Sequence, residues 1–213
     1  MLIESKSNLA KLMATENIIV EQKNVPTAYF NVKDRILVVP TLKEEIGPSL
    51  YDLFMGHEVG HALFTPDEDW TKTTKVPAQF VNVVEDARVE KLMKRKYAGL
   101  AKTFFGGYKE LNEDNFFQLE NEDISKFNLA DKANLYFKIG IHAGEVFSWK
   151  PEEKVLVDEL ANAETFEQVV DVARKILAYT EQQEQQKVVE AQGDLEQSTQ
   201  GGGDSTQGVG DGQ

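Results

Sequence analysis

Two of the chain's three histidines, His57 and His61, are four residues apart, and Glu58 directly follows the first. Four residues advance an α-helix by about 400°, so both imidazoles would project from one face and could share a metal ion. Glu58 would lie about 100° from His57, where it could act on a water molecule without ligating the metal. We therefore expect one Zn²⁺ per chain, held by the two histidines, with Glu58 as general base.

A catalytic zinc site usually has three protein ligands and one open position. Because the chain contains no cysteine, the third ligand must be a histidine or an acid. Glu85 falls on the apolar side of a helix expected over residues 77–97, where metal ligation would offset the cost of burying its charge. We predict Glu85 as the third ligand, with Asp86 as the alternative ligand or as the acid that orients a ligating histidine. Arg88 would neutralise the acid that is left over.

The remaining histidine, His142, lies in an apolar helical segment and is best interpreted as a hydrogen-bonded core histidine. The group that would stabilise negative charge in a transition state is left open between Tyr97, Tyr108 and His142. A hairpin expected over residues 27–39 could offer its edge to an extended peptide. The sequence therefore predicts which residues hold the metal and act as the base, but it gives only an approximate location for the substrate.

The elements that position these residues follow from hydrophobic periodicity and from proline and glycine. Gly47-Pro48 begins the histidine-bearing helix, and Thr65-Pro66 ends it, because the residue before a proline avoids the α region. Lys33-Asp34 separates two β-rich runs and predicts a hairpin turn. Further helices are expected over residues 2–15, 77–97, 129–147, 151–161 and 165–186, with a polar loop over 67–75 and a loop containing Gly106-Gly107.

This pattern predicts a mostly helical α+β fold, a zincin-like domain over residues 1–180. It would have a short antiparallel hairpin before the His-Glu-x-x-His helix and a helical C-terminal part over about 129–180. Residues 181–213 are rich in Gln and Glu and then in Gly, Ser and Thr, which is typical of an acidic flexible tail or linker. Since a linker normally joins two parts, we expect a first domain of a longer architecture, or a relative that lost its second domain.

Composition excludes several classes of function. The formal net charge of −13 disfavours nucleic-acid binding, because an acidic surface repels phosphates. No apolar run approaches the roughly 20 residues of a membrane helix, and the first residues lack the order of a signal peptide. Together with the absence of cysteine, these features lead us to expect a cytoplasmic protein that does not bind membranes, or a host-cytoplasmic one if it is encoded by a phage.

Two segments resemble the N-terminal part of the cobaltochelatase T-subunit family: His-Glu-Val-Gly-His-Ala-Leu-Phe-Thr-Pro at residues 57–66 and Asn-Val-Val-Glu-Asp-Ala-Arg-Val-Glu at residues 82–90. They are also similar to the nitric-oxide-reductase activation protein D relatives and to proteins of tailed phages. The resemblance is specific over about residues 50–98. It implies a gluzincin-like domain followed by an acidic linker and a von Willebrand factor A domain, working with a MoxR-type AAA+ ATPase.

The Asp-x-Ser-x-Ser motif of a von Willebrand A domain does not follow the linker here. The resemblance therefore implies the metallopeptidase-like module rather than chelatase activity. We expect a zinc-dependent peptidase that hydrolyses a peptide or protein substrate. The alternative is a metal-stabilised interaction module that docks a MoxR-type ATPase without proteolysis. Retention of Glu58 favours chemistry, because a purely structural metal site has no use for a base beside His57.

Overall fold

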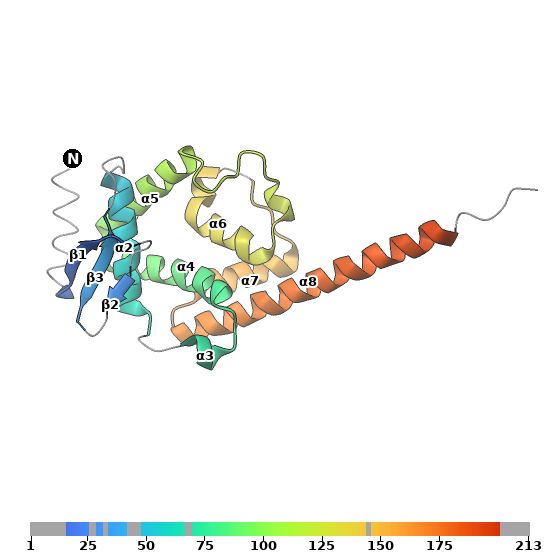
Figure 1. Cartoon of the computed structure of the whole chain (residues 1–213), viewed down its shortest axis with the longest axis horizontal. Helices are drawn as coiled ribbons and strands as arrows, with labels where there is room; N and C mark the ends of the chain where they lie inside the picture. The colour runs from blue at the N-terminus through green and yellow to red at the C-terminus, as the bar shows by residue number, and fades with distance from the viewer. Residues whose placement is uncertain are drawn as a thin grey trace, which may run out of the picture.

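The computed structural model describes residues 16–25, 29–31, 34–41, 48–66, 70–143 and 146–200. The helix expected over residues 2–15 and the end of the tail, residues 201–213, lie outside the described residues. Within them the chain is mostly helical with one small sheet, as expected for the α+β class. The sheet lies at one end of the body, and the last helix projects from the other end (Figure 1).

The helices account for most of the described chain. In order they are α2 (Pro48–Phe64), α3 (Trp70–Thr74), α4 (Ala78–Lys96), α5 (Ala98–Glu113), the 3₁₀ turn η1 (Ile124–Lys126), α6 (Leu129–Ala143), α7 (Pro151–Asn162) and α8 (Phe166–Gln200). The expected helices over 77–97 and 151–161 correspond closely to α4 and α7. Helix α2 begins at Pro48, whose missing amide hydrogen costs nothing in the first helical turn.

A three-stranded sheet precedes α2 and packs on it. Strands β1 (Ile19–Lys23), β2 (Tyr29–Asn31) and β3 (Ile36–Pro40) are arranged in the order β1-β3-β2. The antiparallel pairing of β2 with β3 confirms the expected hairpin, while β1 adds a parallel pairing to β3. Strands β2 and β3 contact α2, and Leu37 of β3 is fully buried in the same core as Val59 of α2.

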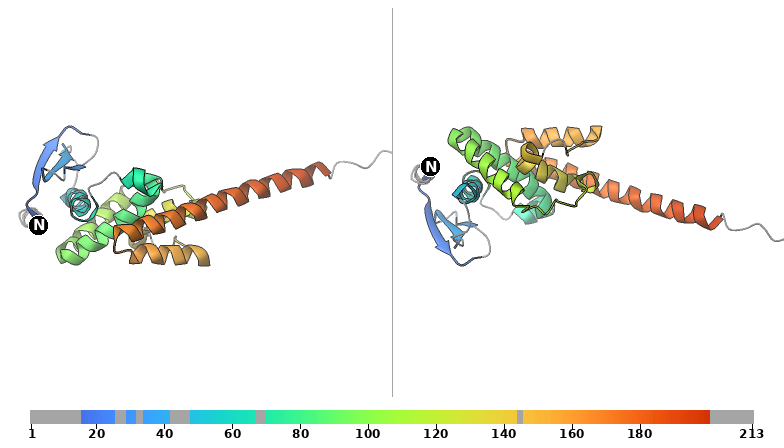
Figure 2. Two further views of the ribbon diagram at one scale, coloured as in Figure 1. Left: turned by 90° about the horizontal axis from the view of Figure 1, so that it is seen from below. Right: turned by 90° about the horizontal axis from the view of Figure 1, so that it is seen from above.

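Two hydrophobic cores are joined by α4. The first lies between the sheet, α2, α5 and α6, and it includes Met93 from the C-terminal half of α4. The second lies between α4, α6, α7 and α8, and it includes Val81 and Val84 from the N-terminal half. All three of these side chains are fully buried. Helix α4 therefore belongs to both halves of the body, between α2 and α8 (Figure 2).

Two segments expected as loops are helical. Gly106-Gly107 lies inside α5, and the expected polar loop over 67–75 contains the short helix α3. Glycine was interpreted as a helix breaker, but Gly107 is needed where α5 crosses α2: a Cβ atom there would lie 2.7 Å from Cβ of Leu53. Close packing of two helices therefore overrides the weak helix propensity of glycine here.

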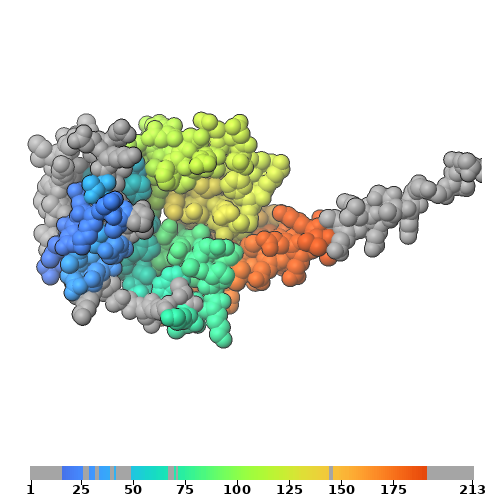
Figure 3. All heavy atoms as spheres, in the orientation of Figure 1, coloured from blue at the N-terminus to red at the C-terminus, as the bar shows by residue number. Residues whose placement is uncertain are grey.

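Helix α8 extends further than the expected end near residue 186. It continues to Gln200, although Thr180 is the last buried side chain among those the structure describes, which reach residue 190. Between residues 181 and 190 nearly all side chains are exposed, including Val188 and Val189. The space-filling view shows this part of α8 leaving the body (Figure 3). The packed body therefore ends near residue 180, where the composition changes, whereas the helix continues to Gln200.

Candidate metal site

His57 and His61 project from α2 toward α4, one helical turn apart, as the spacing predicts. The two helices approach closely at Gly60, where a Cβ atom would lie 2.9 Å from Cγ of Met93. Gly60 permits this close approach of α4 because it has no side chain. This contact brings the acids of α4 within reach of the histidines.

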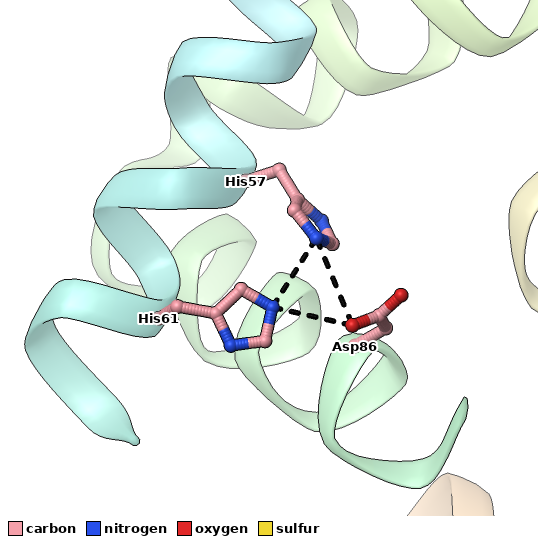
Figure 4. A group of neighbouring side chains, drawn as sticks. All are labelled: His57, His61 and Asp86. Carbon is pink, nitrogen blue, oxygen red and sulfur yellow. Dashed lines mark hydrogen bonds and ion pairs between the residues drawn. The ribbon is translucent and has the colours of Figure 1, made fainter. Parts of the chain in front are cut away.

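Three atoms converge between α2 and α4: Nε2 of His57, Nε2 of His61 and Oδ1 of Asp86 (Figure 4). The two nitrogens are 3.2 Å apart, and Asp86 Oδ1 lies 3.2 Å from His61 Nε2 and 3.7 Å from His57 Nε2. The three side chains are between 18% and 26% exposed, so solvent reaches the group. This group could hold a metal ion.

The separations fit one zinc ion. Zinc binds histidine nitrogen and carboxylate oxygen at about 2.0–2.2 Å, which at tetrahedral angles places ligand atoms roughly 3.3–3.5 Å from one another. The observed separations of 3.2, 3.2 and 3.7 Å fall on both sides of that range. Three ligands also leave the fourth tetrahedral position without a side chain from this group, which is the pattern of catalytic rather than structural zinc sites.

The hydrogen bonds behind the imidazoles fix their tautomers. Nδ1 of His57 lies 3.1 Å from Glu90 Oε1, and a carboxylate can only accept, so Nδ1 carries the proton. Thr65 donates its hydroxyl to Glu85 Oε1 at 2.6 Å, so its oxygen accepts from Nδ1 of His61 at 3.0 Å. In the neutral imidazoles both Nε2 atoms therefore present lone pairs to each other and to Asp86. Three lone pairs at this distance repel unless a cation or a shared proton lies between them.

Glu90 has the most polar partners of the groups that support the site. Its carboxylate is buried, accepts the hydroxyl of Tyr108 as well as His57, and lies 3.3 Å from Nζ of Lys94. Burial raises the pKa of Glu90, but the bond from His57 and the charge of Lys94 outweigh it and lower the pKa overall. Burial lowers the pKa of His57, and Glu90 and Asp86 reverse this and raise it. A carboxylate behind a ligating histidine also makes the imidazole a better metal ligand.

Asp86 is fixed by a hydrogen bond to the carboxylate oxygen that faces away from the histidines. Nζ of Lys138, on α6, lies 3.0 Å from Oδ2, while Oδ1 faces the histidines. Burial raises the pKa of Asp86, but His61, His57 and Lys138 together hold it well below its usual range. The carboxylate therefore stays ionised and presents one oxygen to the group.

Glu85, the acid expected as third ligand, is not brought into this group. Arg88 binds it with two hydrogen bonds, from Nε at 2.7 Å and from a terminal nitrogen at 2.6 Å. Both side chains are buried, and Arg88 also donates to the carbonyl oxygens of Phe64 and Glu164. The structure thus assigns the metal-facing position to the alternative, Asp86. Glu85 is the acid that Arg88 neutralises, and it supports His61 through Thr65.

Glu58 lies beside the group without belonging to it. Its side chain is half-buried, and within the described residues no hydrogen bond or ion pair engages its carboxylate. Burial raises the pKa of Glu58, and the negative charge of Asp86 adds to this, although the two histidines act in the opposite direction. A carboxylate with a raised pKa and free oxygens is suited to exchanging a proton with water.

The three candidates for stabilising a transition state have other partners or surroundings. Tyr97 donates its hydroxyl to Glu16, and Tyr108 donates to Glu90. His142 packs against the ring of Phe105, and its Nε2 is buried without a hydrogen-bond partner among the described residues. His142 is half-buried and belongs to neither hydrophobic core, so the structure does not support the expected role of a hydrogen-bonded core histidine. Lys138, which sequence reasoning missed, is the cationic group bound to Asp86.

Comparison of the chain with protein-family models, with curated proteins and with solved structures found no match. In the part of the chain that the structure describes, none of the helices combines the length and the apolar character of a membrane span. The geometry of the His57–His61–Asp86 group and its supporting residues is therefore the basis for inferring a function.

Proposed function

We propose that this protein is a zinc-dependent peptidase in which His57, His61 and Asp86 hold the metal ion. The observation that carries the proposal is the convergence of three lone-pair atoms at ligand spacing. Each atom is oriented from behind by a different group: Glu90, Thr65 and Lys138. Supporting hydrogen bonds of this kind accompany functional metal sites and set ligand basicity.

Glu58 is the general base of this proposal. When bound, zinc supplies a Lewis acid that polarises a carbonyl group and makes water easier to deprotonate near neutral pH. Glu58 takes the proton of the attacking water and returns it to the leaving amine. The carboxylate of Glu58 is available for both steps, because no hydrogen bond or ion pair engages it within the described residues.

The position of the sheet is consistent with a peptide substrate. Among the described residues β2 is an edge strand, since it pairs only with β3, and it lies against the histidine-bearing helix α2. An extended peptide can add to such an edge through backbone hydrogen bonds. The likeness of residues 57–66 and 82–90 to the cobaltochelatase T-subunit family points to the same gluzincin-like chemistry.

The test is Glu58→Gln, which keeps size and shape but removes the base. Zinc content should stay at about one ion per chain. The rate of hydrolysis of a peptide mixture should fall by about 10²–10⁴-fold, the factor that general base catalysis supplies. Zinc is measured by elemental analysis, and cleavage by mass spectrometry of the digested mixture. His61→Ala serves as the control that loses both zinc and activity.

The second candidate is a metal-stabilised module that docks a MoxR-type ATPase. The observation that favours it is α8, whose exposed outer part extends away from the body and is available to a partner. In that case Glu58→Gln should leave binding of a co-expressed ATPase and its ATP hydrolysis unchanged. A wild-type protein that cleaves nothing in the peptide mixture, and binds the ATPase equally well with either residue, would replace the peptidase proposal.

A further inference from the structure

A cavity of about 860 Å³ lies where helices α6 and α7 begin, and α8 packs against both of these helices (Figure 1). None of His57, His61 and Asp86 lines it, so it is separate from the metal group. Cavities of roughly 300–1,000 Å³ are the usual size for small organic ligands, whereas a water molecule occupies only about 30 Å³. The cavity therefore has room for an organic molecule.

The charge of the cavity lining differs from that of the whole chain. Four lysines and three acids line the cavity, whereas the whole chain has 23 basic and 36 acidic residues. The first turns of α6 and α7 add the partial positive charge of helix N-termini. The lining is thus a positive region on an acidic protein, and it favours an anion over a cation.

One wall of the cavity is a buried ion pair whose charges are already balanced. Nζ of Lys132 lies 2.8 Å from Oε2 of Glu153, and both residues are buried. The same oxygen accepts the backbone amide of Lys150 at 3.0 Å, and the ammonium group of Lys132 lies 4.8 Å from the ring centroid of Trp149. These contacts leave no charge of the pair for a ligand, but they fix the position of the wall.

Two other lysines of the lining have no carboxylate partner among the described residues. Nζ of Lys150 donates to the side-chain oxygen of Gln183 at 3.2 Å, and Lys187 has no ion pair in that part of the chain. Both lysines are exposed where they border the cavity. An anion bound in the cavity would therefore supply the counter-charge that both ammonium groups lack.

The acids of the lining oppose an anion less than their number suggests. Glu153 is neutralised by Lys132, and Asp131 lies in the first turn of α6, where the helix dipole offsets a negative charge. Glu184 is exposed and has no ion pair among the described residues. Its charge should weaken the binding of an anion, so Glu184 can report the sign of the ligand's charge.

Three aromatic residues also line the cavity: Phe127, Trp149 and Tyr179. All three are half-buried, so part of each ring remains open to solvent. The ring of Phe147 stacks on that of Trp149, with 6.4 Å between the centroids. Covering such rings with a planar apolar group is favourable, both by hydrophobic burial and by stacking. An inorganic anion would satisfy the lysines but would leave these rings in contact with water.

We propose that this cavity is a second binding site, for an organic anion that joins a planar ring to phosphate or carboxylate groups. The ring lies against the aromatic residues of the wall, and the acidic groups bind Lys150 and Lys187. The site is independent of the metal group and of the proposed peptidase function.

Calorimetric titration with four compounds separates the ring from the charge. ADP has both, adenosine has only the ring, and ribose 5-phosphate has only the charge. Naphthalenedicarboxylate joins a ring to carboxylates instead of phosphates. At least one of the two ring-containing anions should bind about tenfold or more tightly than adenosine and ribose 5-phosphate, because a hydrogen bond to a charged group contributes that factor. Which of the two binds identifies phosphate or carboxylate as the recognised group.

Substitutions at the rim test the location of the site. Lys150→Gln and Lys187→Gln should each weaken binding about tenfold, and Glu184→Gln should strengthen it, because the rim loses a charge of the ligand's own sign. Lys102→Gln is the matched control, since Lys102 is an exposed lysine of α5 that does not line the cavity. All four residues are exposed, so the variants should fold.

The metal group needs a control of its own, because zinc can bind phosphate directly. The His61→Ala protein should bind the same anion with the affinity of the wild type. Loss of binding in His61→Ala would place the anion on the zinc ion and would overturn the proposal. Equal binding of adenosine, an absence of binding by all four compounds, or binding that both lysine variants leave unchanged would also overturn it. Because a protein without zinc or peptidase activity can still bind the anion, the two proposals fail separately.

Discussion

At the scale of single residues, the assignment of the third ligand depends on what surrounds two adjacent acids. Helical projection places Glu85 toward the apolar side of α4, and the structure confirms that it is buried. Burial alone did not identify the ligand, because Arg88 satisfies Glu85 with two hydrogen bonds. Asp86, at the edge of the apolar sector, is the acid that reaches the histidines. A buried carboxylate needs a counter-charge, and the guanidinium of Arg88 supplies it to Glu85 without a metal ion.

Exchanging each acid for its amide should separate the two roles. Asp86→Asn should weaken zinc affinity by at least about 100-fold, because it removes a charged ligand, whereas orienting groups typically contribute 10–100-fold. Glu85→Gln should change zinc affinity less but should lower the free energy of unfolding by about 3–5 kcal/mol, because it leaves Arg88 buried without its counter-charge. Competition with a chromogenic chelator measures affinity, and urea unfolding measures stability. The opposite ranking of zinc affinities would make Glu85 the ligand.

The sequence predicted the histidines and Glu58 because their arrangement is local: four residues on one helix determine it. It did not predict Glu90 or Lys138, and it considered Tyr108 only for stabilising a transition state, not as the donor to Glu90. The contacts of these three residues span 18 to 52 residues of chain. One signal for Glu90 was available, since it is four residues from Asp86 on the same helix and so faces the same direction. The structure shows Glu90 to be 3% exposed.

At the scale of elements, the contact between α2 and α5 explains why a Gly-Gly pair lies inside a helix. Leu100, Phe104, Tyr108 and Leu111 follow the three- and four-residue spacing of a buried helical face. The pair was interpreted as a loop because glycine is a weak helix former. Hydrophobic periodicity across residues 100–111 was the better indicator. The helices that begin or end at proline, α2, α4 and α7, were predicted more accurately.

The two glycines provide an internal comparison. Gly107→Ala should destabilise the protein by about 1–3 kcal/mol, because the added methyl group would overlap Leu53 and the carbonyl oxygen of Ser49. Gly106→Ala should stabilise it by about 0.5–1 kcal/mol, because the nearest atom is 3.9 Å away and alanine is the better helix former. Thermal and urea unfolding of both variants measure the difference. Two effects of the same sign would contradict the packing of α5 on α2.

At the scale of the whole molecule, the body and the projecting part of α8 should be thermodynamically separate. Removal of all residues after Glu190 should leave the melting temperature unchanged, because α8 has already left the packed body before this point: nearly all side chains at 181–190 are exposed. A longer deletion that begins at Val172 removes Ala173 and Ile176 from the second core and should abolish cooperative unfolding. Calorimetry of both truncated proteins provides the comparison. A lower melting temperature for the short deletion would show that the tail packs on the body.

The shape of α8 also has a mechanical consequence. Residues 181–200 continue the helix for about 30 Å beyond the buried Thr180. A helix is stiff and transmits force and torque, whereas a flexible coil does not. This segment can therefore pass a force to the body only while it remains helical. Without tertiary contacts its helicity depends on temperature and length. A pull on its outer end acts first on the hydrogen bonds that Gln183 and Tyr179 of α8 make with Lys150 and Glu153, at the start of α7.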